Sequence, residues 1–187
     1  MGRSVRIFAA VLFVCLVSLE LPAQQDDRAI RRERNLKARA HWRRADARRM
    51  KKQYEDARKD YEDAASLWEA NGNRNFSTVT RLMVDLCTTI TELNVKKLKN
   101  GEYQGTARGY SGDITVAVRL KNGRVVNFAV TNHRESRPLK SLEILPTAIG
   151  RKQSPSVDAV SGATVTSYGV MAATLQALER AKPGADE

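Results

Sequence analysis

Cysteine and histidine are scarce, which removes several classes of cofactor. The 187 residues include only two cysteines, Cys15 and Cys87, and two histidines, His41 and His133. No Cys-x-x-Cys pair exists, so haem attachment, iron–sulfur clusters and cysteine-rich zinc sites have no support. The histidines are far apart, and no carboxylates stand at ligand spacing beside them. We therefore expect no metal site.

Aromatic and acidic residues are also limited. Aromatic side chains make up 6% of the chain, which leaves few to spare for stacking platforms. The 21 acidic residues are outnumbered by 32 Lys and Arg, so the net charge is +11. The window that begins at Arg28 and ends at Lys59 holds 14 of the basic residues and only 4 acidic ones. Two interpretations stay open: a solvated helix face, or a surface that docks an anionic membrane or an acidic partner.

The N-terminus has the pattern of an export signal. Arg3 and Arg6 precede an apolar run over residues 7–19, and Leu21-Pro22-Ala23 supplies a cleavage site. The run is short for a membrane span, which needs about 20 apolar residues. We expect residues 1–23 to be a signal peptide or an N-terminal anchor. The protein is then exported, to the periplasm or the outer face of the cytoplasmic membrane, and nucleic acid is not an expected partner.

Residues 27–99 lack proline and contain glycine only at Gly72, which favours helix. Apolar residues recur at steps of three and four from Met50 to Trp68, and again from Val79 to Leu93. The sequence Asn-Gly-Asn at 71–73 marks a turn between the two stripes. We predict a basic helical hairpin over residues 27–99, with Ser77 or Thr78 capping its second helix.

The pattern changes after residue 99. Residues 113–120 alternate apolar and polar side chains, Asn122-Gly123 is a hairpin signal, and residues 125–131 resume a strand-like pattern. Residues 139–149 are predicted to be helical with an interruption at Pro146, and residues 157–160 are β-like. Residues 168–181 form a clear helix, and residues 182–187 are a disordered tail. The fold class is α+β, with the helical hairpin followed by a small antiparallel sheet and a C-terminal helix.

The most informative stretch is Asp158-Ala-Val-Ser-Gly-Ala-Thr-Val-Thr-Ser167. Gly162 and Ala163 permit close approach by a bulky group, and several hydroxyls surround them. We expect the last helix to begin just afterwards, with Thr166 or Ser167 as its cap. The free N–H groups and the positive dipole end of a helix start favour a phosphate. By these features alone the stretch is either an anion-binding turn or a capped turn without a ligand.

The stretch resembles the Asp-x-x-Ser/Thr-Gly-Ala-Thr signature of the FMN-binding domain family. Asp158, Ser161, Gly162, Ala163 and Thr164 match the signature, and Thr166-Ser167 continue it. Upstream, residues 101–105 with Gly109-Tyr110 resemble the opening of the family, and His133-x-Glu135-Ser136 resembles its His-x-Glu-Thr segment. Members include subunits of the Rnf and sodium-pumping quinone reductase complexes and small exported flavoproteins.

The resemblance implies a fold, a cofactor and partners. Residues 100–181 would be an FMN-binding domain that carries FMN as a phosphoester on Thr164, attached by a separate flavin transferase. Asp158 would assist that transfer or hold the turn. The resemblance further suggests flavin contacts for Tyr110, His133 and Glu135, for which core, surface or ion-pairing roles are the alternatives.

The implied function is an exported electron carrier that exchanges electrons with a partner redox protein. No acid–base pair or nucleophile triad is visible, so we predict no catalytic residues and no complete enzyme. The alternative is a module that binds FMN non-covalently, or an anionic surface, without redox turnover.

Overall fold

The computed structural model describes residues 4–136 and 139–185, with side chains from residue 26 onward, and its class is α+β. Three helices come first: α1 (Ser4–Met50), α2 (Tyr54–Ala70) and α3 (Arg74–Thr89). The short 3-10 helix η1 (Val95–Lys97) leads to the strands β1 (Gly101–Arg108), β2 (Asp113–Lys121) and β3 (Arg124–His133). The helices α4 (Lys140–Lys152) and α5 (Thr164–Arg180) complete the chain. Residues 1–3 of the N-terminal segment and 186–187 of the tail lie outside the described residues.

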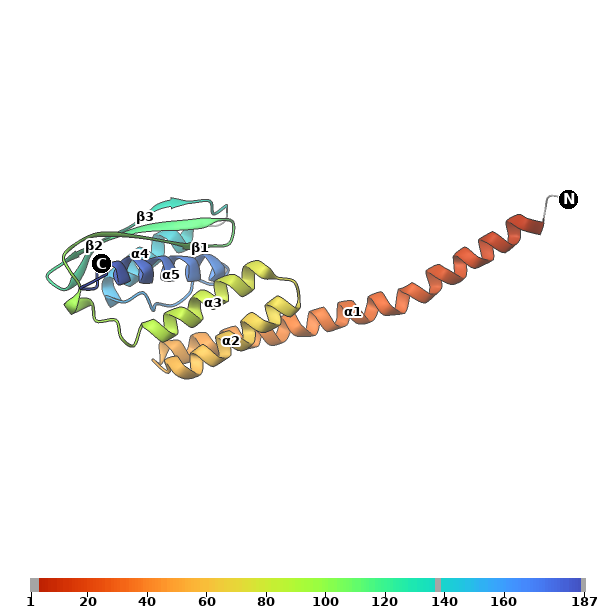
Figure 1. Ribbon diagram of the computed structural model, residues 1–187, viewed down its shortest axis with the longest axis horizontal. Helices are drawn as coiled ribbons and strands as arrows, with labels where there is room; N and C mark the ends of the chain where they lie inside the picture. The colour runs from red at the N-terminus through yellow and green to blue at the C-terminus, as the bar shows by residue number, and fades with distance from the viewer. Residues whose placement is uncertain (1–3, 137–138, 186–187) are drawn as a thin grey trace.

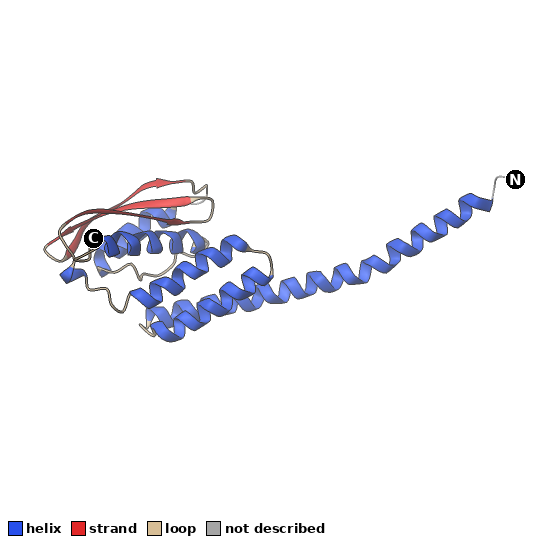
Figure 2. Ribbon diagram, in the orientation of Figure 1, coloured by secondary structure: helices blue, strands red, loops and turns tan. Residues whose placement is uncertain are grey.

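The body of the molecule is layered. Figure 1 shows the antiparallel sheet on one side, α4 and α5 beneath it, and α3, α2 and the end of α1 beyond them. The N-terminal part of α1 projects far from this body as a single long helix (Figure 2). The helices lie on one side of the sheet, which places α5 between the strands and the N-terminal helices.

The predicted helical hairpin is wrong in one respect, because the structure has three helices where two were expected. The apolar stripe that begins at Met50 does not run along one helix: α1 ends at Met50, and α2 begins at Tyr54 and packs back along α1. The turn at 71–73 is confirmed, but α3 begins at Arg74, so neither Ser77 nor Thr78 is its cap. The helical spacing of the apolar residues was predicted correctly, but the prediction that they lie on one continuous helix was wrong.

The same backbone motif ends both α1 and α2. The N–H of Gln53 bonds to the carbonyl of Arg48 at 2.9 Å, and the N–H of Lys52 bonds to that of Arg49 at 2.9 Å. This is the Schellman pattern, which places Lys52 in the left-handed region with φ of 62°. Gly72 occupies the corresponding position after α2, with φ of 74°. A glycine there announces the turn in the sequence, whereas a lysine does not.

The sheet has the order β1-β2-β3 with antiparallel neighbours throughout. The expected β2–β3 hairpin is confirmed: Lys121 pairs with Arg124, and Asn122 and Gly123 form the two-residue turn with positive φ at both positions. Strand β1 was not predicted, because its sequence contains two glycines and little apolar alternation. Its Gly105 lies against the backbone of Ala173 in α5, so no side chain fits there.

Three expectations for the C-terminal half need correction. The helix α4 runs through Pro146 without interruption. The helix α5 begins at Thr164, four residues before the expected start, so Thr166 and Ser167 lie in its first turn and do not cap it. Residues 157–160 form no strand, because side chains satisfy their backbone: Arg49 donates to the Val157 carbonyl, and Ser167 Oγ accepts from the Val160 N–H.

One hydrophobic core spans the N-terminal helices and the sheet. Buried residues of α2 and α3, such as Tyr61 and Met83, belong to the same cluster as Val116 of β2 and Met171 of α5. The division at residue 99/100 stays a prediction, since the core continues across it.

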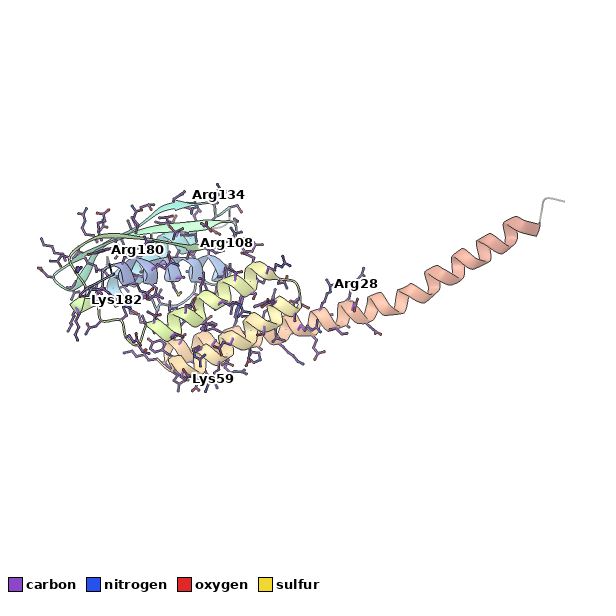
Figure 3. The ribbon with its side chains drawn as sticks, in the orientation of Figure 1. Arg28, Lys59, Arg108, Arg134, Arg180 and Lys182 are labelled. Carbon is purple, nitrogen blue, oxygen red and sulfur yellow. The ribbon has the colours of Figure 1, made fainter. Side chains whose placement is uncertain are left out.

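The basic window of residues 28–59 does not form one continuous arm. Figure 3 shows Arg28 on the projecting part of α1 and Lys59 on α2 within the body. Several of its arginines are used internally, because Asp60 pairs with Arg44 at 2.6 Å and with Arg48 at 2.7 Å. Among the described residues, no helix is long and apolar enough to cross a membrane.

We predict that Asp60→Asn weakens the packing of α1 on α2 in a pH-dependent way. The side chain of Asp60 is 3% exposed; burial alone would raise its pKa, but its bonds to Arg44 and His41 outweigh this and hold the pKa below the usual value. This stabilisation is therefore present above the unfolded pKa and lost as pH falls through the folded one. Chemical denaturation should show a loss of about 2 kcal/mol near neutral pH that begins to shrink near about pH 4 and vanishes only below the folded pKa.

Asp63→Asn is the matched control, since Asp63 is 62% exposed and lies 3.5 Å from His41. It should change the free energy of unfolding little. An Asp60→Asn effect that stays constant down to pH 3 would contradict the ion-pair explanation.

We also predict that Lys52→Gly stabilises the protein. A lysine in the left-handed backbone region costs about 1 kcal/mol relative to glycine. The hydrogen bond of Lys52 in the described structure comes from its backbone N–H, so a glycine can keep it. Relief of this strain should raise the free energy of unfolding by about 0.5–1 kcal/mol. Part of this gain is offset, because glycine gives the unfolded chain more conformational entropy. Gly72→Ala should shift it in the opposite direction. A destabilised Lys52→Gly variant would show that the lysine side chain itself contributes.

Candidate functional site

The signature segment forms a tight turn that leads directly into α5. The N–H of Ala163 bonds to the carbonyl of Val160 at 2.9 Å, which closes a β-turn over residues 160–163. Gly162 is its third residue and has φ of 79°, as a type II turn requires. Nothing lies within 4 Å of where a Cβ of Gly162 would be, so the glycine is needed for its backbone conformation.

The start of α5 presents free backbone donors. Its N-cap is Ala163, which has no side chain able to accept a hydrogen bond, and the first intrahelical bond is that from the Ser167 N–H to the Ala163 carbonyl. The N–H groups of Thr164, Val165 and Thr166 therefore have no partner within the helix. Together with the helix dipole they favour an anion at this end.

The four hydroxyls of the segment are in different situations. Thr166 is buried and donates to Glu135 Oε2 at 2.7 Å. Ser167 is buried, donates to the Ala163 carbonyl at 2.9 Å and accepts from the Val160 N–H at 3.0 Å. Ser161 is exposed. The hydroxyl of Thr164 is partly exposed and makes no hydrogen bond within the described part of the chain.

A cavity of about 720 Å³ opens beside Thr164. Residues 162–166 form one side of it, and Tyr110 follows β1 at its edge. The opposite side comes from the N-terminal helices: Leu36, Arg39, Trp42, Arg43 and Asp46 of α1, and Phe76 of α3.

Aromatic side chains gather at this cavity although the chain has few of them. The ring of Trp42 lies 5.6 Å from that of Phe76, and Phe76 lies 6.5 Å from Tyr110. The Trp42 ring also packs against Trp68 and Tyr168, with ring centroids 5.1 Å and 5.7 Å away. The cavity therefore has an aromatic wall suited to a flat apolar ring.

Glu135 is buried and positions the loop that carries Tyr110. Its Oε2 accepts from Thr166, and its Oε1 accepts from the Ser111 N–H at 3.1 Å. Among residues 4–136 and 139–185, Glu135 has no arginine partner. Glu135 thus ties the loop after β1 to the first turn of α5, next to the cavity and not within it.

Two other predicted residues lie away from the cavity. Asp158 is exposed, and its carboxylate makes no hydrogen bond within the described residues. An Asx-type bond that would hold the turn is therefore absent there. His133 ends β3, where its Nδ1 is buried without a hydrogen-bond partner among the described residues. Neither side chain lines the cavity.

A polar cluster joins α1 to the flanks of the site; it consists of the partly exposed Asp46 and the buried Arg49, Tyr61 and Tyr168. Asp46 accepts from Arg49 at 3.0 Å, from Tyr61 at 2.7 Å and from Tyr168 of α5 at 2.8 Å. Arg49 also donates to Ser156 Oγ at 3.1 Å and to the Val157 carbonyl at 2.8 Å, just before the signature. Burial opposes the charge of Arg49, but Tyr61 and Asp46 outweigh it and raise its pKa, so Arg49 stays charged.

The α1 wall of the cavity could not be found by inspecting motifs. Leu36, Arg39, Arg43 and Asp46 repeat at steps of three and four, which is one helical face, but that face resembles any other solvated arginine-rich face. Trp42 packs against Trp68 between the helices and also lines the cavity.

The fold also brings His41 close to Asp60 and Asp63, a grouping that sequence spacing did not show. Asp60 already pairs with Arg44 and Arg48. These two cations occupy the carboxylate and repel a metal ion, so the group is an ion-pair network.

Comparison with known proteins finds matches for the C-terminal part of the chain. The model of the FMN-binding domain matches residues 109–179. The chain is 33% identical over 89 residues to an uncharacterized protein of Treponema pallidum (strain Nichols), across 46% of this chain and 25% of that protein. It is 31% identical over 87 residues to NADH:acrylate oxidoreductase of Vibrio harveyi, across 46% of this chain and 9% of that enzyme. The chain thus spans at most about a quarter of these relatives.

Residues 109–179 are thus similar to the FMN-binding domain family. This match, together with the oxidoreductase relative, supports a flavoprotein with FMN as its cofactor.

We predict that Arg49→Met destabilises the protein, because it removes the counter-charge of the partly exposed Asp46 and leaves the Val157 carbonyl without its hydrogen bond from Arg49. Denaturant unfolding should show a loss of about 2–3 kcal/mol. Adding Asp46→Asn should restore part of that loss, because the uncompensated charge is then gone. Strictly additive losses would show that the two residues act independently.

Proposed function

We propose that Thr164 carries FMN as a phosphoester and that the protein is an exported electron carrier. The observation that carries this proposal is the state of the Thr164 hydroxyl. Within its segment it is the hydroxyl that both lines the cavity and makes no hydrogen bond among the described residues. Thr166 and Ser167 are buried and bonded, and Ser161 lies outside the cavity wall.

The residues present fit FMN. The cavity volume of about 720 Å³ is within the range of small-molecule sites, roughly 300–1,000 Å³. The N–H groups at the start of α5 suit the phosphate, and Trp42, Phe76 and Tyr110 suit the ring system. When bound, FMN supplies electron transfer in steps of one or two electrons.

The attachment needs a nucleophile, a leaving group and an acceptor for one proton. The Thr164 oxygen forms a bond to the FMN phosphorus of FAD, the bond from that phosphorus to AMP breaks, and AMP leaves. The hydroxyl proton passes to a base of the flavin transferase or to Asp158. The exposed and unpaired carboxylate of Asp158 fits a role in this transfer better than a role in holding the turn.

Export and partners belong to the same proposal. The charged and apolar N-terminal segment supports export, and a tethered flavin suits a compartment from which free FMN would diffuse away. The relative from Vibrio harveyi is named as an oxidoreductase, which supports a redox role. The partner is a redox protein on the periplasmic side, and the basic residues of α1 offer a docking surface for it or for an anionic membrane.

We predict that co-expression with a flavin transferase adds the mass of one FMN less water to the mature chain. The yellow colour should survive denaturation. Thr164→Ala should abolish the adduct, and Thr164→Ser should keep it because a hydroxyl remains. Ser161→Ala is the matched control and should be labelled like wild type. Intact mass and visible absorbance measure all four proteins.

An adduct that persists in Thr164→Ala and maps to another hydroxyl would contradict the assignment. A wild-type chain of unmodified mass that is yellow but loses its colour on denaturation, under conditions that label a known substrate, would favour the non-covalent alternative.

A further inference from the structure

One wall of the flavin cavity lies outside the family domain. The family match begins at residue 109, whereas Leu36, Arg39, Trp42 and Arg43 of α1 line the cavity opposite Thr164. By their helical spacing these residues share one face of α1, a helix that packs against α2 within the body (Figure 1). The cavity is therefore formed jointly by the domain and by a helix that the domain does not contain.

Two large apolar side chains at this cavity are exposed to solvent. Leu36 is 61% exposed and Tyr110 is 56% exposed, and they belong to different segments that meet at the cavity. Exposed apolar side chains gathered around a hollow are typical of a ligand site. A flat apolar ring held between α1 and the loop after β1 would cover both.

Arg39 and Arg43 are the arginines of α1 that remain available at this place. Farther along the helix, Arg44 and Arg48 pair with Asp60, and Arg49 pairs with Asp46. Arg39 and Arg43 make neither an ion pair nor a hydrogen bond within the described residues, and both line the cavity. Asp46 beside them is already neutralised by Arg49.

We infer that α1 forms part of the flavin site and contributes side chains that contact the cofactor. Resting on the proposed attachment at Thr164, the isoalloxazine ring would pack against the aromatic wall of Trp42, Phe76 and Tyr110. Arg39 and Arg43 would face the negative charge of the cofactor. Reduction adds negative charge within the cavity, and two positive charges there favour it. Arg39 and Arg43 therefore raise the reduction potential of the flavin, and Trp42 quenches its fluorescence by close contact.

The test uses the full chain loaded with FMN by a flavin transferase. The midpoint potential and the flavin fluorescence are measured at low salt for wild type, for the double variant Arg39→Gln/Arg43→Gln and for Trp42→Phe. Arg32→Gln is the matched control, because Arg32 is exposed on α1 and does not line the cavity. Thermal unfolding of each protein checks its fold. Replacing the two exposed arginines should leave the unfolding temperature unchanged.

The expected result is a lower potential in the double variant, an unchanged potential in Arg32→Gln, and a several-fold rise of flavin fluorescence in Trp42→Phe. The potential shift should shrink as salt is added, since exposed charges are screened. Fully labelled variants with wild-type potential and wild-type fluorescence would overturn the inference and leave the proposed attachment intact. Absence of the label from folded wild-type protein would instead remove the proposed function and this inference with it.

Discussion

The arrangement depends on one ion pair on the last turns of α1, between the buried Arg49 and the partly exposed Asp46. Asp46 binds Tyr61 of α2 and Tyr168 of α5, and Arg49 binds the backbone at Val157. Residues far apart in the chain are thereby fixed at one point, which sets where α1 crosses the start of α5. Removing Asp46 would leave the buried charge of Arg49 without its counter-charge, whereas the complete cluster satisfies its polar groups.

The functional cavity follows from that crossing. The turn at 160–163 and the first residues of α5 would otherwise form an open surface with free N–H groups and an unbonded Thr164 hydroxyl. With α1 held alongside, Trp42 and Phe76 supply an aromatic wall, and Arg39 and Arg43 supply positive charge. The N-terminal helices thus contribute to the environment of the cofactor as well as to the core.

Local signals predicted local structure. The Asn122-Gly123 hairpin and the spacing of the apolar stripes were correct, because a turn type and a helical period depend on neighbouring residues. The break at Lys51–Gln53 was invisible, because Lys52 adopts a conformation usually taken by glycine. The signature named Thr164, whereas the α1 wall depends on contacts such as Asp46 with Tyr168, 122 positions apart. Such contacts leave no periodicity or spacing in the sequence.

We expect the N-terminal helices and the FMN-binding domain to unfold as one cooperative unit around the cavity. Native-state hydrogen exchange tests this expectation by comparing buried amides of α2 with those of β2 as denaturant is added. A single core and the Asp46–Arg49 cluster predict that both sets of amides converge on the same free energy of opening. If the amides of α2 exchange through a separate opening of clearly lower free energy while β2 stays protected, the claim is contradicted.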